Sequence, residues 1–187
     1  MIDLRKKGLP DRIQVAGKSY LLYTDFREWI EFGNRLQENK CSIADLAFVV
    51  KDLTLLELLE NPKDFYEELY KFYCNPNITP KSIESEDSEI LVDYIQDGEY
   101  IVGSFMSEYH IDLTECDMHW HMFKALFQSL SEDSKIKQIM NMRGYRKNNT
   151  SYESQCRKLK EMWRLPQYNN TIDKSILDDI NNEFYNC

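Results

Sequence analysis

The sequence predicts a mainly α-helical protein: a single helical domain with one β-hairpin near its N-terminus. Six or seven segments repeat apolar residues at helical spacing and start at capping residues, whereas only one segment alternates apolar and polar residues. With 187 residues, 42% of them apolar and 13% aromatic, the chain can bury one good hydrophobic core. We expect the domain to cover residues 1–165, with a mobile loop near 75–88 and a weakly ordered tail at 166–187.

The N-terminal segment predicts a β-hairpin followed by a helix. Residues 11–24 alternate apolar and polar positions around Ala16-Gly17, which is typical of two short strands joined by a tight turn. Asp25 with Glu28 marks the start of a helix whose apolar stripe includes Trp29. Because a lone hairpin is only marginally stable, we expect this stripe to pack on the hairpin.

Three helical segments follow between residues 42 and 73. Ser42 and Thr54 each precede an acidic residue by three positions, at Asp45 and Glu57, which is the spacing of a capping box. Pro62 follows an asparagine cap, and proline is favoured at the first position of a helix. We therefore expect a new helix to begin at each of these three points.

The helix that begins at Pro62 carries more aromatic residues than one buried stripe needs. The six residues that we expect to bind a partner are Phe65, Tyr66, Leu69, Tyr70, Phe72 and Tyr73. Broad aromatic exposure is typical of protein interfaces. The alternative is that part of this face packs in the core against a central helix.

Residues 109–130 carry the densest helical signal and predict that central helix. Helical spacing is already present at residues 90–95 and again at 101–109. Thr114 precedes Asp117 by three positions, so we expect a capping box at the start of the helix. Its large aromatic side chains predict burial on most sides. The side chains that we expect in the structural core are Trp29, Trp120, Phe123 and Phe127.

Two more helices are expected before the tail. Ser131 has the chemistry of a cap for the first, and Gly144 stands where a C-cap would end it. The second covers residues 152–163 and is closed by Pro166. The asparagine-rich tail beyond it is only weakly periodic, so we assign it no structure.

Charge and cysteine usage restrict the classes of function. A net charge of -9 disfavours a general nucleic-acid binder, because phosphate contacts need positive surface. No apolar run approaches the roughly 20 residues of a membrane helix. Five widely spaced cysteines without a CxxC pair indicate reduced thiols. We therefore expect a cytosolic protein that binds neither nucleic acid nor membrane.

Acidic and basic residues are segregated along the chain. Residues 82–123 hold 11 acidic residues and no Lys or Arg, whereas residues 134–165 hold nine basic and two acidic ones. Either these segments neutralise each other within the fold or they present opposite faces to partners. The basic segment, with its aromatic residues, could also bind a nucleic-acid backbone, which the acidity of the whole chain disfavours.

A group of histidines and a cysteine resembles the ligand clusters of metal sites. The candidate ligands are His110, Cys116 and His119, with His121 close by. On a helix, at about 100° per residue, His119 and His121 would point roughly 200° apart, and no HExxH motif supports a site. We expect no metal and no cofactor. The sequence also lacks a GxSxG motif and a Gly-rich phosphate loop, so we expect no enzymatic activity.

Several motifs together resemble a known family. They are Tyr109-His110-Ile111-Asp112-Leu113, Met118-His119-Trp120, Phe123 with Ala125-Leu126, Arg143, Leu9-Pro10, and Thr24-Asp25-Phe26-Arg27 with Trp29-Ile30. Over most of residues 9–143 the chain resembles the gene-product-fifteen family of bacteriophages, which is encoded in siphophage tail clusters. One position departs from the pattern, because His121 stands where we expect an aromatic residue.

The resemblance implies a role in tail assembly. Family members are typically encoded between the major tail protein and the tape measure protein, the position of tail assembly chaperones. It implies a non-enzymatic chaperone in the host cytoplasm that binds the tape measure protein, with the major tail protein as a further candidate partner, and that self-associates. Two alternatives stay open: a small metal-dependent enzyme or regulator that uses the histidine and cysteine cluster, and a structural component of the tail.

Overall fold

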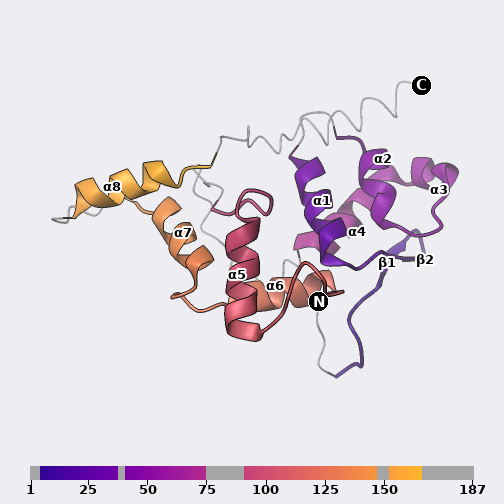
Figure 1. The fold of residues 1–187 in the computed structure, drawn as a ribbon. Coiled ribbons are helices and arrows are strands. Elements are labelled where there is room, and N and C mark those ends of the chain that lie inside the picture. Colours follow the sequence, from indigo (N-terminus) through magenta and orange to yellow (C-terminus); the bar gives the residue numbers. More distant parts are fainter. Residues whose placement is uncertain (1–4, 38–40, 75–90, 147–151, 166–187) are drawn as a thin grey trace. The chain divides into compact units, whose positions relative to one another are not determined.

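The computed structural model describes residues 5–37, 41–74, 91–146 and 152–165, which are mainly helical (Figure 1). Their elements are β1 (Arg12–Val15), β2 (Lys18–Leu21), α1 (Phe26–Leu36), α2 (Ile43–Leu46), the 3₁₀ helix η1 (Ala47–Val49), α3 (Leu55–Glu60), α4 (Pro62–Cys74), α5 (Gly98–Tyr109), α6 (Trp120–Ser129), α7 (Lys135–Arg143) and α8 (Glu153–Met162). The predicted class, mainly α with an N-terminal hairpin, is confirmed. The loop expected near 75–88 and the tail expected at 166–187 lie outside the described residues.

The chain divides into two compact units. Of the described residues, unit 1 contains 5–37, 41–74 and Met118–Phe123, and unit 2 contains 91–117, 124–146 and 152–165. Helix α6 therefore begins in unit 1 and continues, from Lys124, in unit 2. The predicted domain over residues 1–165 includes every described residue of both units.

The hairpin of unit 1 forms where the sequence predicts it. Strands β1 and β2 pair antiparallel, in a register that places Val15 opposite Lys18. The two residues between them, Ala16 with a φ of 49° and Gly17 with a φ of 79°, both lie in the left-handed region. A two-residue type I′ turn requires positive φ at both positions, and glycine adopts it without steric cost.

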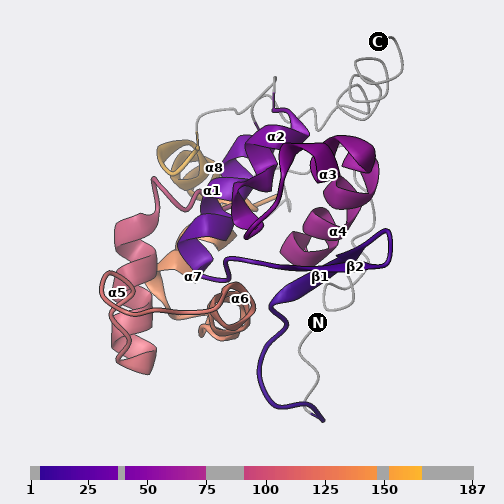
Figure 2. The ribbon, with the colours of Figure 1, turned by 90° about the vertical axis from the view of Figure 1, so that its right-hand side faces the viewer.

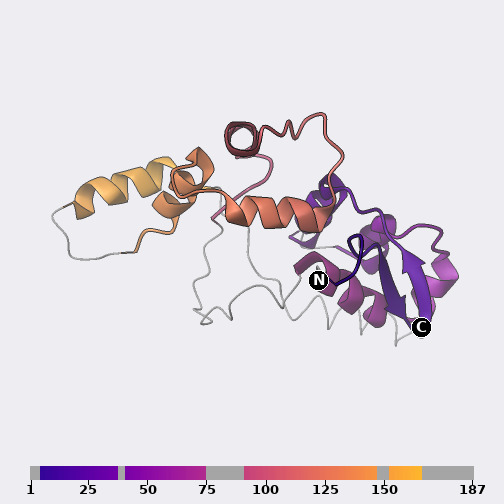
Figure 3. The same ribbon diagram turned by 90° about the horizontal axis from the view of Figure 1, so that it is seen from below.

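The main helical neighbour of the hairpin is α4 (Figures 2 and 3). The expectation that α1 would be this neighbour was wrong. The Tyr20 ring meets Phe65 of α4 edge-on, with 4.9 Å between ring centroids. Helix α1 packs instead on α2 and η1. Its Trp29 is fully buried and donates its ring N–H to the Tyr23 carbonyl at 2.8 Å. The hairpin thus obtains the packing that it needs from a helix later in the chain.

The predicted helix starts in unit 1 are confirmed. The side chain of Asp25 accepts a hydrogen bond from the backbone N–H of Arg27 at the start of α1. The capping boxes of Ser42 and Thr54 are both formed, before α2 and α3. Helix α4 begins at Pro62. These starts were predictable because a cap is satisfied by residues two or three positions away.

The central helix begins at Trp120, so the prediction of a start at Thr114 was wrong. Thr114 donates from its N–H and its hydroxyl to the Asp112 carboxylate, at 2.8 and 2.6 Å. The stretch before α6 pairs with the start of α1. The Met118 carbonyl accepts the first N–H of α1 at 2.9 Å, and Trp120 N–H donates to the Thr24 carbonyl at 2.8 Å. Because these backbone groups bond to a distant segment, they are not available to an earlier helical turn.

In unit 2, α5 packs on α7 and α7 packs on α8. A buried ion pair joins the turn before α5 to the end of α7: the Arg143 guanidinium donates to both oxygens of Asp97, at 2.5 and 2.8 Å. Arg143 also donates to the carbonyls of Leu91, at 3.0 Å, and Trp163, at 2.5 Å. One side chain therefore fixes three segments of unit 2 together.

The helical spacing at residues 90–95 does not produce a helix in the described part of that segment. Residues 94–97 form a turn. The Asp93 carboxylate accepts the N–H groups of Ile95 and Gln96, at 2.8 and 2.9 Å. An aspartate that bonds to nearby backbone N–H groups stabilises a turn in competition with a helix.

The helix after α6 ends where predicted but starts later. Gly144 is the C-cap of α7, as expected. Ser131 is not its N-cap, because the Ser131 N–H and hydroxyl both bond to the Glu108 carboxylate. The N-cap is Ser134.

Candidate partner-binding surface

Helix α3 exposes most of its apolar surface. Leu55, Leu56 and Leu59 are 64%, 69% and 45% exposed, whereas Leu58 is buried. At about 100° per residue the three exposed leucines lie within an arc of roughly 100° on one side of the helix. We call these three residues the α3 leucine face. Contiguous exposed apolar surface of this kind marks sites of interaction.

Two sets of contacts hold α3 in the orientation that exposes these leucines. At its N-terminus, Thr54 and Glu57 form the capping box. On its other side, Lys18 of β2 forms an ion pair with Glu57. The bond from Lys18, followed by those from Thr54, lowers the pKa of Glu57 to about 2. The carboxylate therefore stays ionised at neutral pH and keeps both contacts.

Three of the six residues expected to bind a partner are core residues of unit 1. Phe65, Leu69 and Phe72 are buried. Phe72 packs on Trp29, with 4.5 Å between ring centroids. The sequence could not separate these residues from a surface, because α4 packs against the hairpin as well as against α2 and α3 and therefore buries more than one stripe.

The other three expected residues, all tyrosines of α4, are half-buried. Tyr73 stacks on Trp120 at 5.3 Å and belongs to the packing of unit 1. Tyr66 and Tyr70 stack on each other at 6.0 Å. A hydrogen bond with Cys74, and then burial, raises the pKa of Tyr70. Tyr66 and Tyr70 are therefore neutral at physiological pH and remain partly accessible beside α3, on which α4 packs.

The α3 leucine face was not singled out from the sequence. Its signal was the run Leu55-Leu56-Glu57-Leu58-Leu59, in which four of five residues are leucine. A short helix with one buried stripe can cover only part of such a run. The excess of apolar residues could have been noticed, but only the packing decides that Leu58 is the buried one.

The four expected core side chains are all buried. Trp29, Trp120 and Phe123 lie in unit 1, and Phe127 lies in unit 2. Phe123 stacks on Phe26 of α1 at 4.7 Å. Phe127 meets Tyr94 edge-on at 6.0 Å, and burial raises the pKa of Tyr94 to about 12.

His119 and His121 are not arranged as they would be on one continuous helix. His119 precedes α6 and forms an isolated β-bridge with Asp25, so the rings of His119 and His121 lie 5.2 Å apart instead of pointing away from each other. His119 accepts the His121 backbone N–H at Nδ1, at 3.0 Å, and donates from Nε2 to the Pro10 carbonyl, at 2.9 Å. Both ring nitrogens of His119 are therefore occupied by backbone groups.

His121 is buried, and its Nε2 donates to the Phe72 carbonyl at 2.9 Å. Among the residues that the structure describes, no group of three or more His, Cys, Asp or Glu side chains is placed to hold a metal ion. The contacts of His119 and His121 tie the start of α6 to the N-terminal segment and to α4. Their observed role is structural.

The environment of His119 predicts a pH dependence of stability. Burial lowers its pKa from the ordinary 6.5. The unfolded chain therefore takes up the proton first as pH falls, so the stability contributed by neutral His119 is present above about pH 6.5 and is lost below it. We expect the urea midpoint to fall from pH 7 to pH 5, and His119→Gln to reduce this fall. An equal fall in both proteins would contradict the assignment, and a comparison at pH 8, where the imidazole is neutral, is the control.

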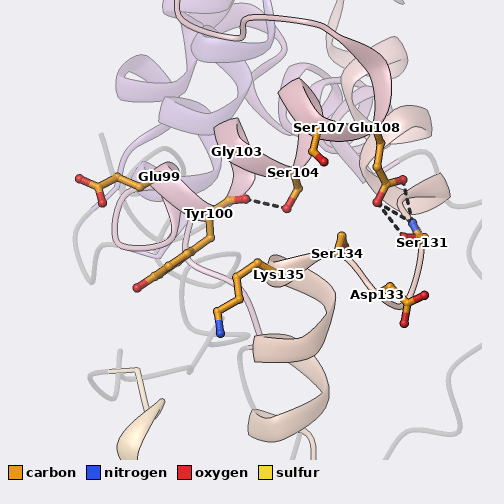
Figure 4. Close-up of a pocket in the computed structure, with 10 residues that line it drawn as sticks. All are labelled: Glu99, Tyr100, Gly103, Ser104, Ser107, Glu108, Ser131, Asp133, Ser134 and Lys135. Atoms are coloured by element: carbon orange, nitrogen blue, oxygen red, sulfur yellow. Dashed lines mark hydrogen bonds between the residues drawn. The ribbon is translucent and has the colours of Figure 1, made fainter.

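Unit 2 contains a hollow between α5 and the turn before α7 (Figure 4). Its volume is about 390 Å³, and it is lined by Glu99, Tyr100, Gly103, Ser104, Ser107, Glu108, Ser131, Asp133, Ser134 and Lys135. The Ser104 hydroxyl donates to the Tyr100 carbonyl at 2.7 Å, and the Ser131 hydroxyl donates to Glu108 at 2.8 Å. The lining contains no histidine or cysteine, and its bonded serines stabilise the helix and the turn.

The chain is similar to one known protein family. A family model described as "Bacteriophage Gp15 protein" matches residues 6–165, a range that contains every helix and strand described above. Searches of curated proteins and of solved structures returned no match. In the described residues, none of the helices combines the length and the apolar character that a membrane crossing needs.

Proposed function

This chain belongs to the bacteriophage Gp15 protein family, and from this premise we propose that it is a non-enzymatic tail assembly chaperone that binds the tape measure protein. The tape measure protein carries long apolar helical stretches that aggregate when they are exposed. A chaperone in the host cytoplasm would cover them reversibly, with several copies per client, until tail subunits polymerise. The major tail protein is a further candidate partner.

The observation that supports this proposal best is the α3 leucine face. An amphipathic client helix recognised in a groove or on a flat face supplies apolar residues at positions i, i+3, i+4 and i+7. Leu55, Leu56 and Leu59 offer an apolar surface for such a stripe. The half-buried Tyr66 and Tyr70 lie on the neighbouring helix α4. Tyrosine is enriched at interfaces because it combines an apolar ring with a polar group.

The alternative functions are a metal-dependent enzyme or regulator and a structural component of the tail. The metal-dependent enzyme or regulator lacks support, because the nitrogens named above on His119 and His121 bond to backbone groups. A structural component of the tail would also need an apolar contact surface. It differs from a chaperone in one respect, since it would remain in the finished particle.

The test is co-expression of this chain with its tape measure protein. We expect a larger soluble fraction of the tape measure protein, and co-purification of the two. Replacing Leu55, Leu56 and Leu59 together by glutamine should weaken binding about a hundredfold, since each leucine contributes on the order of 1 kcal/mol at an interface and 1.4 kcal/mol is tenfold. The melting temperature should change little because these side chains are exposed.

Ile95→Gln is the matched control. Ile95 is 71% exposed and lies in unit 2, away from α3 in the sequence, so replacing this exposed aliphatic side chain by glutamine should leave client binding intact. An unchanged soluble yield of tape measure protein would remove the chaperone role. Detection of this chain in stoichiometric amount in purified tails would assign the structural role instead.

A further inference from the structure

Helix α8 packs on α7 along one side, where Cys156 and Leu159 are half-buried and Lys160 donates to the Tyr145 carbonyl, and it exposes its other side. At its C-terminal end, the Trp163 ring meets Tyr100 edge-on at 5.6 Å, and the Trp163 carbonyl accepts the bond from Arg143. Within the helix no residue is buried. Figures 1 and 3 show α8 extending from α7, on the side away from α5.

A helix as short as α8 depends on the packing of its inner side on α7. A helix of ten residues is marginal in water by itself, and most helical stability in proteins comes from packing an amphipathic face. In α8 the outward side chains include Arg157 and Met162, which are 68% and 75% exposed, together with exposed Lys158. Arg and Met are enriched at interfaces. The composition and exposure of α8 therefore indicate a face that binds a partner.

The charge of α8 indicates the chemistry of that partner. The helix and its C-cap neighbour carry Arg157, Lys158, Lys160 and Arg164 against Glu153 and Glu161. Arg157 pairs with Glu153 and Arg164 with Glu161 on the same exposed surface. Exposed pairs of this kind contribute only about 0–1 kcal/mol, so they rearrange easily when a stronger acidic surface approaches.

The same chain presents a complementary surface. Residues 108–117, which we call the acidic segment, contain Glu108, Asp112, Glu115 and Asp117 and no Lys or Arg. Glu108 bonds to Ser131 and Asp112 bonds to Thr114, whereas Glu115 and Asp117 are exposed. In the described residues, no ion pair joins this segment to α8 of the same chain.

We propose that α8 of one copy docks on the acidic segment of a second copy of this chain. Two different surfaces of unit 2 meet in such a contact, so it is heterologous and joins copies head to tail. A heterologous contact repeats until it closes into a ring or continues as a filament. The inference rests on the proposed function, in which several copies act together, and specifies the surfaces that would join them, but it does not require the client.

The proposal is tested by sedimentation velocity of the full chain, alone, at 50 and 500 mM NaCl. We expect assemblies at low salt that dissociate at least tenfold more readily at high salt, because the screening length falls well below 10 Å. The α8 variant, Arg157→Glu with Lys158→Glu, should be monomeric at both salt concentrations. The segment variant, Glu115→Lys with Asp117→Lys, should also be monomeric, since like charges then face each other.

A mixture of the α8 variant and the segment variant gives the decisive test of the contact. In the mixture each reversed surface meets a reversed partner, so assembly at low salt should return. Lys6→Glu with Lys63→Glu is the matched control, because both residues are exposed and the change in net charge equals that of the α8 variant. This control should assemble like the wild type, and so should the variant of the α3 leucine face.

Three outcomes would overturn the proposal. They are a wild-type chain that is monomeric at low salt, an assembly that neither charge reversal affects, and a mixture that stays monomeric. Binding of a DNA duplex by the wild type, lost in the α8 variant without any self-association, would assign α8 to nucleic acid. Loss of self-association with intact client binding would leave the proposed chaperone function standing, so the two proposals fail separately.

Discussion

Replacing Trp120 by alanine is expected to lower the free energy of unfolding by about 3–5 kcal/mol, the usual cost of emptying a large aromatic site in a core. Trp120 is 1% exposed and stacks on Tyr73, with an angle of 5° between the rings. Its ring N–H donates to the Tyr73 carbonyl at 3.1 Å, so the substitution also removes a partly buried hydrogen bond. Because total stability is about 5–15 kcal/mol, the variant should be barely folded.

The surroundings of Trp120 leave little room for relaxation. Tyr73 is held between Trp120 and Phe32, and its ring lies against Gly33, where an added Cβ would be 2.9 Å from Cζ. A well-packed site of this kind does not collapse around a cavity, so its cost remains high. The start of α6 should loosen together with this site, since Trp120 is its first residue.

The measurement is urea unfolding followed by circular dichroism, with Trp163→Ala as the matched control. Trp163 is half-buried, so the same substitution should cost less there. Trp120→Phe should retain part of the stability because a ring remains in the site. If Trp120→Ala keeps the wild-type melting temperature but loses the tape measure protein, Trp120 lies on a binding surface and not in the core.

Replacing Arg143 by methionine is the second change with a large expected effect, also about 3–5 kcal/mol. The substitution leaves the Asp97 carboxylate, 1% exposed, without the guanidinium that bonds to both of its oxygens. It also removes the bonds from Arg143 to the Leu91 and Trp163 carbonyls. An uncompensated buried charge costs more than the pair contributes, because the desolvation of the carboxylate is no longer offset.

A double-mutant cycle separates the ion pair from the rest of the site. Asp97→Asn with Arg143→Met should cost less than the sum of the two single changes, since no buried charge remains. Arg157→Met is the control, because its pair with Glu153 is exposed and should contribute about 0–1 kcal/mol. Additive losses in the cycle would contradict the coupling of Asp97 and Arg143.

The pairing of Asp97 with Arg143 could not be predicted from the sequence. The local pattern places Asp97 between the helical spacings at residues 90–95 and 101–109, and Arg143 just before the expected C-cap at Gly144. The two residues are 46 positions apart, and no local pattern connects them. The segregation of acidic and basic residues indicated compensation somewhere in the fold without identifying the pair that is buried.

For the candidate partner-binding surface, too, the sequence predicted an excess of apolar residues but not where the exposed ones lie. The sequence indicated that the helix that begins at Pro62 carries more aromatic side chains than one buried stripe needs. It assigned the excess to α4, where Phe65, Leu69 and Phe72 are in fact core. The exposed excess is on α3, because α4 packs on the hairpin, α2 and α3 and so buries the residues that were expected to face a partner.

The sequence by itself determined the helical class, the hairpin with its Ala16-Gly17 turn, and the helix starts at Asp25, Ser42, Thr54 and Pro62. These features depend on residues two to four positions apart, so local sequence patterns are sufficient to predict them. Only the tertiary structure decided where α6 begins. The pairing of Met118 and Trp120 with the start of α1 joins backbone groups more than 90 residues apart, and this pairing displaces the helical start that the local pattern at Thr114 predicted.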